Sequence, residues 1–143
     1  MSATAVRIIQ VAVPFVWLGA VLAISFLEAP LKFRAPGVTI PIGLGIGRLV
    51  FRALNLAEAV FAVTVLAAAA AGSLPERVIV LAAVAAALLA GQVGVIRPVL
   101  SRRSDRVLAG GDPSRSHAHL WYVTLEAAKV VALAALGASL LAR

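Results

Sequence analysis

Apolar residues in this chain gather into four long runs separated by shorter polar stretches. A bilayer core of about 30 Å requires about 20 apolar residues of α-helix, and each run reaches that length. The runs predict helices at about residues 6–30, 47–71, 75–96 and 117–141. The second and third runs are joined by a very short connection, which favours an antiparallel pair. We therefore predict an all-α integral membrane bundle of four transmembrane helices, antiparallel up-down-up-down, as a single domain over residues 1–143.

The composition supports this class. Hydrophobic residues make up 62% of the chain and charged residues only 13%, whereas about a quarter of a soluble domain is charged. The net charge of +7 comes from basic residues placed between apolar runs, not from a basic face interleaved with aromatic residues. This arrangement favours membrane orientation and argues against nucleic-acid binding. The absence of Cys from the sequence excludes disulfides and thiol chemistry.

Basic residues are unevenly divided between the two ends of the predicted bundle. Three arginines, Arg7, Arg77 and Arg143, lie on the side of the termini. Eight basic residues lie on the side of the two long connections: Lys32, Arg34, Arg48, Arg97, Arg102, Arg103, Arg106 and Arg115. Because cytoplasmic loops carry an excess of Lys and Arg, we expect the long basic loops in the cytoplasm. Both termini would then lie on the outer side of the plasma membrane, which in a bacterium is the inner membrane.

Polar residues on the fourth predicted helix fall on one stripe. His119, Tyr122, Glu126 and Lys129 are spaced by three, four and three residues, which matches the period of an α-helix. Ionisable groups within a membrane span are costly and usually face a protein interior or a water-filled cavity. This stripe is therefore a candidate functional face.

The second predicted helix carries a comparable set of polar residues. Arg48, Arg52 and Asn55 form one stripe, and Glu58 follows one turn later. At 1.5 Å per residue, Glu58 and Lys129 both lie about 13 Å along their helices from the cytoplasmic side. We therefore expect the charged groups of the two helices to reach a similar depth.

Together these residues predict a polar chamber that opens to the cytoplasm and is closed on the outer side by apolar residues. Its expected members are Glu28, Arg48, Arg52, Asn55, Glu58, Gln92, Arg97, His119, Tyr122, Glu126 and Lys129. A structural interpretation stays open, because buried charges also pair with one another and fix helix register. Against it, apolar packing would hold a bundle of this size together at lower cost.

Three alternating glycines, Gly43, Gly45 and Gly47, precede the predicted start of the second helix. Backbone N–H groups at a helix N-terminus, with arginines close by, suit the binding of an anion. The alternative is that the glycines form a flexible or closely packed turn. Their spacing matches no nucleotide-binding fingerprint.

We find no nucleophile motif, predict no catalytic residue, and leave the cofactor undetermined. A metal site would combine His119 with Glu126 and Glu58. The Glu-x-x-His spacing of carboxylate four-helix bundles is absent, however. Metal binding is therefore kept only as an alternative.

Two segments also carry a resemblance. Residues 47–58 read G-R-L-V-F-R-A-L-N-L-A-E, and residues 119–129 read H-L-W-Y-V-T-L-E-A-A-K. Both resemble segments of small, uncharacterised four-helix bacterial membrane proteins. The resemblance implies the four-helix fold and carries no known activity, so it transfers no functional residue.

Three functions are compatible with these patterns. The first is a small-solute or ion channel or transporter, built as a homo-oligomer, whose chamber receives an anion or a proton-coupled solute. The second is a non-catalytic accessory or structural subunit that binds a partner, or anionic lipid through Arg102, Arg103 and Arg106. The third is a membrane-embedded enzyme or metal protein that uses the metal candidates above.

Overall fold

A computed structural model of the protein describes residues 2–71, 74–112 and 117–142. The regular structure in these three stretches is entirely helical. Four helices are long and apolar enough to cross a membrane: Ala3–Arg34, Ile40–Ala70, Glu76–Leu108 and His119–Leu141. The predictions of an all-helical chain and of four membrane-length helices are thus confirmed.

The first long helix changes its winding along its length. It consists of α1 (Ala3–Val21), the π-helical segment η1 (Leu22–Glu28), α2 (Ala29–Leu31) and the 3-10 turn η2 (Lys32–Arg34). The hydroxyl of Ser2 caps its start by accepting a hydrogen bond from the Ala5 N–H. It ends at Ala35, which is extended as expected for the residue before a proline.

The second long helix, α3 (Ile40–Ala70), begins seven residues earlier than predicted. Thr39 caps it by accepting a hydrogen bond from the Ile42 N–H, and Pro41 lies in the first turn, where its missing N–H costs nothing. The apolar pattern alone did not indicate this start, because residues 40–46 are rich in glycine.

The third long helix continues beyond the predicted end at residue 96. It consists of α4 (Glu76–Gly91), the π-helical segment η3 (Gln92–Ile96) and α5 (Arg97–Leu108). The prediction of a loop from residue 98 is therefore wrong. Pro98 is tolerated because it follows directly on the π segment, where the Arg97 N–H bonds to the Gln92 carbonyl five residues back. The Ala29 N–H makes the same kind of bond to Ile24, directly before Pro30.

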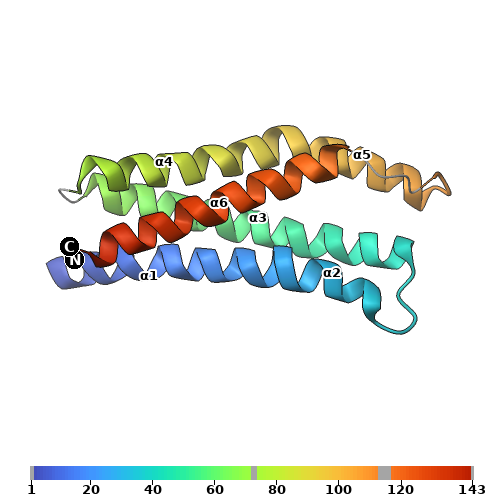
Figure 1. The fold of residues 1–143 in the computed structure, drawn as a ribbon, viewed down its shortest axis with the longest axis horizontal. Coiled ribbons are helices and arrows are strands. Elements are labelled where there is room, and N and C mark those ends of the chain that lie inside the picture. The colour runs from blue at the N-terminus through green and yellow to red at the C-terminus, as the bar shows by residue number, and fades with distance from the viewer. Residues whose placement is uncertain (1, 72–73, 113–116, 143) are drawn as a thin grey trace.

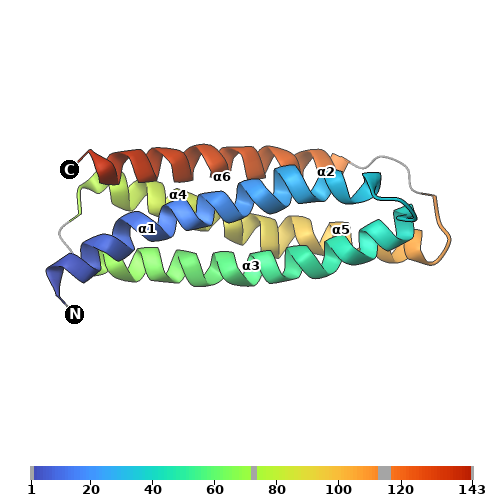
Figure 2. The same cartoon turned by 90° about the horizontal axis from the view of Figure 1, so that it is seen from below.

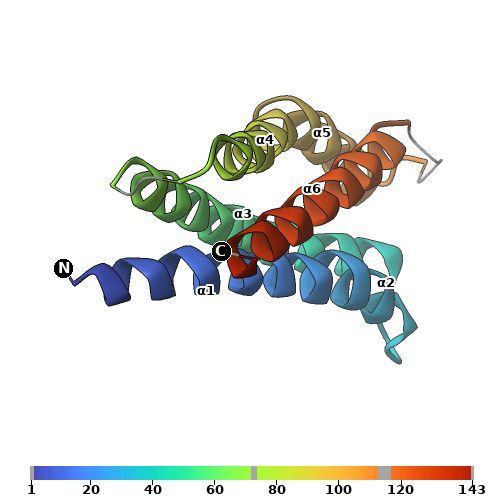
Figure 3. The same cartoon turned by 60° about the vertical axis from the view of Figure 1, so that its left-hand side comes forward.

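The four long helices lie side by side along one axis (Figures 1 and 2). The last of them is α6 (His117–Leu141). Both chain ends lie at one end of the bundle, and α2 and α5 lie at the other (Figure 2). With the chain ends turned forward, α1 and α4 lie on opposite sides with α3 and α6 between them (Figure 3), in agreement with the contacts of α1 and of α4 with both α3 and α6.

An apolar core fills the half of the bundle nearest the chain ends. It includes Trp17, Val21, Ala62, Val65, Val78, Ala82, Ala85, Leu89, Leu133, Leu136 and Leu140. Many large apolar side chains instead point outward, among them Leu49, Leu56 and Val131. An outer surface of this kind suits contact with lipid.

Candidate functional site

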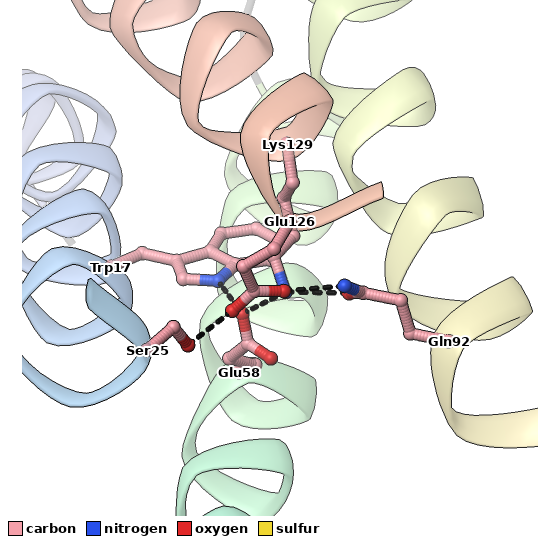
Figure 4. A network of polar contacts seen from close by, with 6 residues as sticks. All are labelled: Trp17, Ser25, Glu58, Gln92, Glu126 and Lys129. Atoms are coloured by element: carbon pink, nitrogen blue, oxygen red, sulfur yellow. Dashed lines mark hydrogen bonds and ion pairs between the residues drawn. The ribbon is translucent and has the colours of Figure 1, made fainter. Parts of the chain in front are cut away.

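The centre of the bundle holds a buried network around the ammonium group of Lys129 (Figure 4). Lys129 Nζ lies 2.5 Å from Glu58 Oε1 and 3.0 Å from Glu126 Oε2. It also donates a hydrogen bond of 2.7 Å to Gln92 Oε1. Lys129 and Glu58 are fully buried, so one ammonium group pairs with two carboxylates away from solvent.

Each helix of the bundle contributes to this network. Trp17 Nε1 donates to Glu58 Oε1 at 2.9 Å, and Ser25 Oγ donates to Glu126 Oε1 at 2.5 Å. The amide nitrogen of Gln92 donates to Glu126 Oε2. Glu126 is thereby held by three partners, while Glu58 Oε2 is buried without a hydrogen-bond partner among the described residues.

The local winding of the chain positions two of these side chains. Ser25 lies inside the π segment η1, and Gln92 opens the π segment η3. π segments are rare and often mark functional sites. Glu126 and Lys129 are three residues apart on α6 and therefore lie on the same face.

A cavity of about 510 Å³ lies directly beside the network, toward the end of the bundle that carries α2 and α5. Glu126 and Ser25 belong both to its wall and to the network. Four basic side chains line it: Lys32, Arg48, Arg97 and Arg103. The rest of its wall is mostly apolar.

Phe51 lines this cavity, and its ring is in contact with three polar side chains. The guanidinium carbon of Arg97 and Nζ of Lys32 are each 5.5 Å from its centroid. Tyr122 packs its ring against Phe51 edge to face, with centroids 5.6 Å apart. An aromatic ring attracts cations within about 6 Å through its quadrupole. The Phe51 ring therefore attracts both Arg97 and Lys32 and also packs against Tyr122.

The basic residues of the cavity differ in their partners. Lys32 Nζ pairs with Glu28 at 3.2 Å, and Arg48 Nη2 pairs with Asp105 at 2.5 Å. Arg97 forms no ion pair with any carboxylate in the described part of the chain. With the Asn55 amide oriented so that its oxygen faces the guanidinium, this oxygen accepts from Arg97 Nε at 2.7 Å and Nη2 at 3.1 Å.

Most of the residues proposed for the chamber come together around the network and the cavity. Glu58, Gln92, Glu126 and Lys129 form the network, and Asn55 bonds to Arg97. Arg48, Arg97, His119 and Tyr122 line the cavity. His119 is exposed, whereas Tyr122 is buried.

Two residues expected in the chamber lie outside it. Arg52 is exposed and does not line the cavity. At about 100° per residue it is rotated about 120° from Glu58, so it falls on the outer side of α3. Glu28 is half-buried, pairs with Lys32 and lies beside a separate surface pocket.

The three glycines proposed for an anion-binding loop do not lie in a loop. All three belong to the first turns of α3, because the cap at Thr39 starts the helix before them. A Cβ on Gly43 would overlap the Phe33 ring, and one on Gly47 would lie 3.0 Å from Lys32 Nζ. At these two positions the glycines therefore allow close helix packing, while Gly45 has open space around it.

The structure also bears on the metal alternative. Within the described residues, no group of three or more His, Cys, Asp or Glu is arranged to hold a metal ion. Glu58 and Glu126 do face one position in common, and the ammonium group of Lys129 occupies it.

Several residues of the site were not among the candidates for the chamber, including Trp17, Ser25, Lys32 and Phe51. Phe51 lies seven residues before Glu58, or two helical turns, so its position on the same face was detectable. Trp17 and Ser25 lie in an apolar run without periodic polar residues. Only the tertiary fold reveals their bonds to Glu58 and Glu126.

Comparison with protein-family models, with curated proteins and with solved structures finds no match to this chain. What supports the resemblance noted from the sequence is therefore the set of four apolar helices, which is consistent with a small membrane protein.

Proposed function

We propose that the protein is a small-solute or ion channel or transporter that receives an anionic solute in the cavity between its four helices. The observation that carries this proposal is the cavity itself, with four basic side chains in its wall and the buried Lys129 network at its inner boundary. Ionisable groups are expensive within a membrane and commonly mark solute or proton pathways.

The orientation is part of the proposal. The end of the bundle with α2 and α5 holds most of the basic residues, so we place it on the cytoplasmic side of the bacterial inner membrane. The chain then crosses the membrane in an antiparallel up-down-up-down order with both termini outside. Four helices form a thin wall, so we expect the protein to act as a homo-oligomer.

In this mechanism the network is the barrier between the cavity and the apolar half of the bundle. Lys129 on α6 pairs with Glu126 on its own helix and with Glu58 on α3, so the Glu58–Lys129 pair is the one that joins the two helices. Protonation of Glu58 removes its charge attraction to Lys129 and loosens the contact between α3 and α6. Glu58 Oε2, which has no partner, offers a position for that proton.

The proposal is tested by flux into proteoliposomes that contain the purified full chain. Uptake of chloride, inorganic phosphate and benzenesulfonate is measured with and without a pH gradient. We expect flux of at least one anion, with loss of that flux in Glu58→Gln and Glu126→Gln. Glu76→Gln serves as the matched control, because Glu76 is exposed at the start of α4. Absence of protein-dependent flux for all three anions contradicts the proposal.

One observation favours a second candidate, an accessory subunit that binds anionic lipid. The helix Glu76–Leu108 has 33 residues, which is about 50 Å at 1.5 Å per residue and exceeds a bilayer core of about 30 Å. Its last segment, α5, carries Arg102, Arg103 and Arg106. If this is the function, charge removal at these three arginines reduces binding to vesicles that contain phosphatidylglycerol, and Glu126→Gln leaves that binding unchanged.

A further inference from the structure

We infer that the cavity binds an organic anion, with one oxyanion group held by Arg97 and Tyr122 and an apolar body held by the aromatic and aliphatic wall. This inference names the substrate class of the proposed transport site, so its consequence for transport rests on the proposed function. Binding itself can be tested separately from transport.

The first support is the hydroxyl group of Tyr122. The side chain is 7% exposed, and its oxygen is buried without a hydrogen-bond partner among the described residues. Tyr122 also lines the cavity. Buried polar groups are normally hydrogen-bonded, so this hydroxyl requires an acceptor, and an oxygen atom of a ligand in the cavity would supply one.

The second support is the charge of Arg97. Asn55 occupies the Nε and Nη2 edge of its guanidinium, which leaves Nη1 available. Lys32 and Arg48 have carboxylate partners, whereas Arg97 is half-buried without one among the described residues. A guanidinium in this situation suits a carboxylate, phosphate or sulfonate group, which supplies both negative charge and acceptor oxygens.

Phe51 brings these two groups into one place. Arg97 lies over its ring, and the Tyr122 ring packs against it at nearly a right angle. The ammonium group of Lys32 lies close to the same ring and adds positive charge. The head group of a ligand would therefore be held near Phe51, where the positive charges of Arg97 and Lys32 meet.

The third support is the size and character of the remaining wall. A volume of about 510 Å³ falls within the range of about 300–1,000 Å³ typical of small-molecule sites. Phe26, Phe33, Leu44, Leu100 and Val123 contribute apolar surface. A chloride ion would leave most of this surface without a contact, so we assign the space to an apolar body. A free organic acid and the phosphate and acyl chains of an anionic lipid both have this chemistry.

The test measures equilibrium binding of benzenesulfonate to the full chain in nanodiscs of neutral phosphatidylcholine. Benzenesulfonamide has a similar shape without the charge, and methanesulfonate has the charge without the ring. We expect saturable binding of benzenesulfonate and much weaker binding of the other two. Equal binding of benzenesulfonate and benzenesulfonamide overturns the inference, as does the absence of saturable benzenesulfonate binding.

Two variants locate the head group. A hydrogen bond to a charged group contributes about 1.5–3 kcal/mol, so Arg97→Gln should weaken binding by about 10-fold to 100-fold. Tyr122→Phe keeps the ring contact with Phe51 and should weaken binding by about 10-fold. Arg77→Gln is the matched control for net charge, because Arg77 is exposed near the start of α4 and outside the cavity wall. An equal loss in Arg77→Gln and Arg97→Gln overturns the inference.

A further measurement separates the two sources of the ligand. If benzenesulfonate binds more weakly in phosphatidylglycerol nanodiscs than in neutral ones, and Arg97→Gln removes the difference, an anionic lipid is the natural occupant. Equal affinity in both nanodiscs identifies a free organic acid. Binding that depends on Arg97 without any flux supports the inference and contradicts transport. Flux of chloride or phosphate without benzenesulfonate binding supports transport and contradicts the inference.

Discussion

At the end of the bundle that carries the chain termini, the four helices pack through apolar side chains, whereas at the other end they surround charged groups and a cavity. Val65, Val78 and Leu136 are buried at the first end. Gln10, a buried polar side chain there, donates to the Ala68 carbonyl at 2.9 Å. At the other end the same helices surround a cavity lined by basic residues. The difference shows that this chain can pack its helices through apolar side chains alone. The buried charged side chains therefore need an explanation other than helix packing.

The largest expected effect comes from removing the cation of the network. Lys129→Met leaves the carboxylates of Glu58 and Glu126 buried without their shared partner. We expect the free energy of unfolding to fall by about 3–5 kcal/mol, measured by steric trapping or by titration with SDS in mixed micelles. The triple variant Lys129→Met/Glu58→Gln/Glu126→Gln should recover much of this loss. A loss of less than about 1 kcal/mol in the single variant would show that water or a conformational change satisfies the carboxylates.

A second variant tests the apolar end. Leu136 is fully buried between the helices, and Leu136→Ala should lower the free energy of unfolding by about 2–4 kcal/mol through loss of packing. Binding of benzenesulfonate should be unchanged, because Leu136 does not line the cavity. Val131→Ala is the control, since Val131 is largely exposed. Reduced binding in Leu136→Ala would contradict the independence of the two ends.

A third variant is expected to stabilise the protein, in contrast to the first two. Tyr122→Phe removes a buried hydroxyl that has no partner among the described residues and keeps the ring. We expect the free energy of unfolding to rise by about 1–2 kcal/mol in the absence of ligand. The same unfolding assays measure it. A decrease instead would mean that the hydroxyl is hydrogen-bonded in the membrane, for example to water.

The smallest effect is expected at the edge of the cavity. Arg48 and Asp105 form an ion pair in which the Asp105 side chain is mostly exposed. Exposed pairs contribute about 0–1 kcal/mol, so Asp105→Asn should change the free energy of unfolding by no more than that. A loss as large as that of Lys129→Met would remove the distinction between the network and the outer ion pairs.

The sequence predicted the all-helical fold and the four helices of membrane length, because long apolar runs are a strong signal. It also placed Glu58 and Lys129 at a similar depth, and these two side chains contact each other. Periodicity alone could not exclude Arg52, because it lies within about 60° of Arg48 and Asn55 around the helix, although it is about 120° from Glu58. Periodicity also could not show that Phe51, an apolar residue, contacts both Arg97 and Tyr122 in the cavity wall.

The ends of the helices were less predictable. The continuation through Pro98 depends on the π segment η3, and such a segment has no simple pattern in sequence. The early start of α3 depends on a single cap at Thr39, before a glycine-rich stretch that would favour a loop on propensity alone.

The π segments η1 and η3 have a consequence for how this chain tolerates changes in length. A π segment carries one residue more than the α-helix would need, and each residue turns the helix by about 100°. Deletion of the surplus residue from η3, such as Gly94, would let this segment close into a regular α-helix and would keep α5 and Arg97 near their present angle relative to α4. Deletion of one residue from the regular part of α4 would instead turn α5 by about 100°. The π segments therefore allow the chain to lose or retain one residue at these two places while the side chains of α2 and α5 keep facing the cavity.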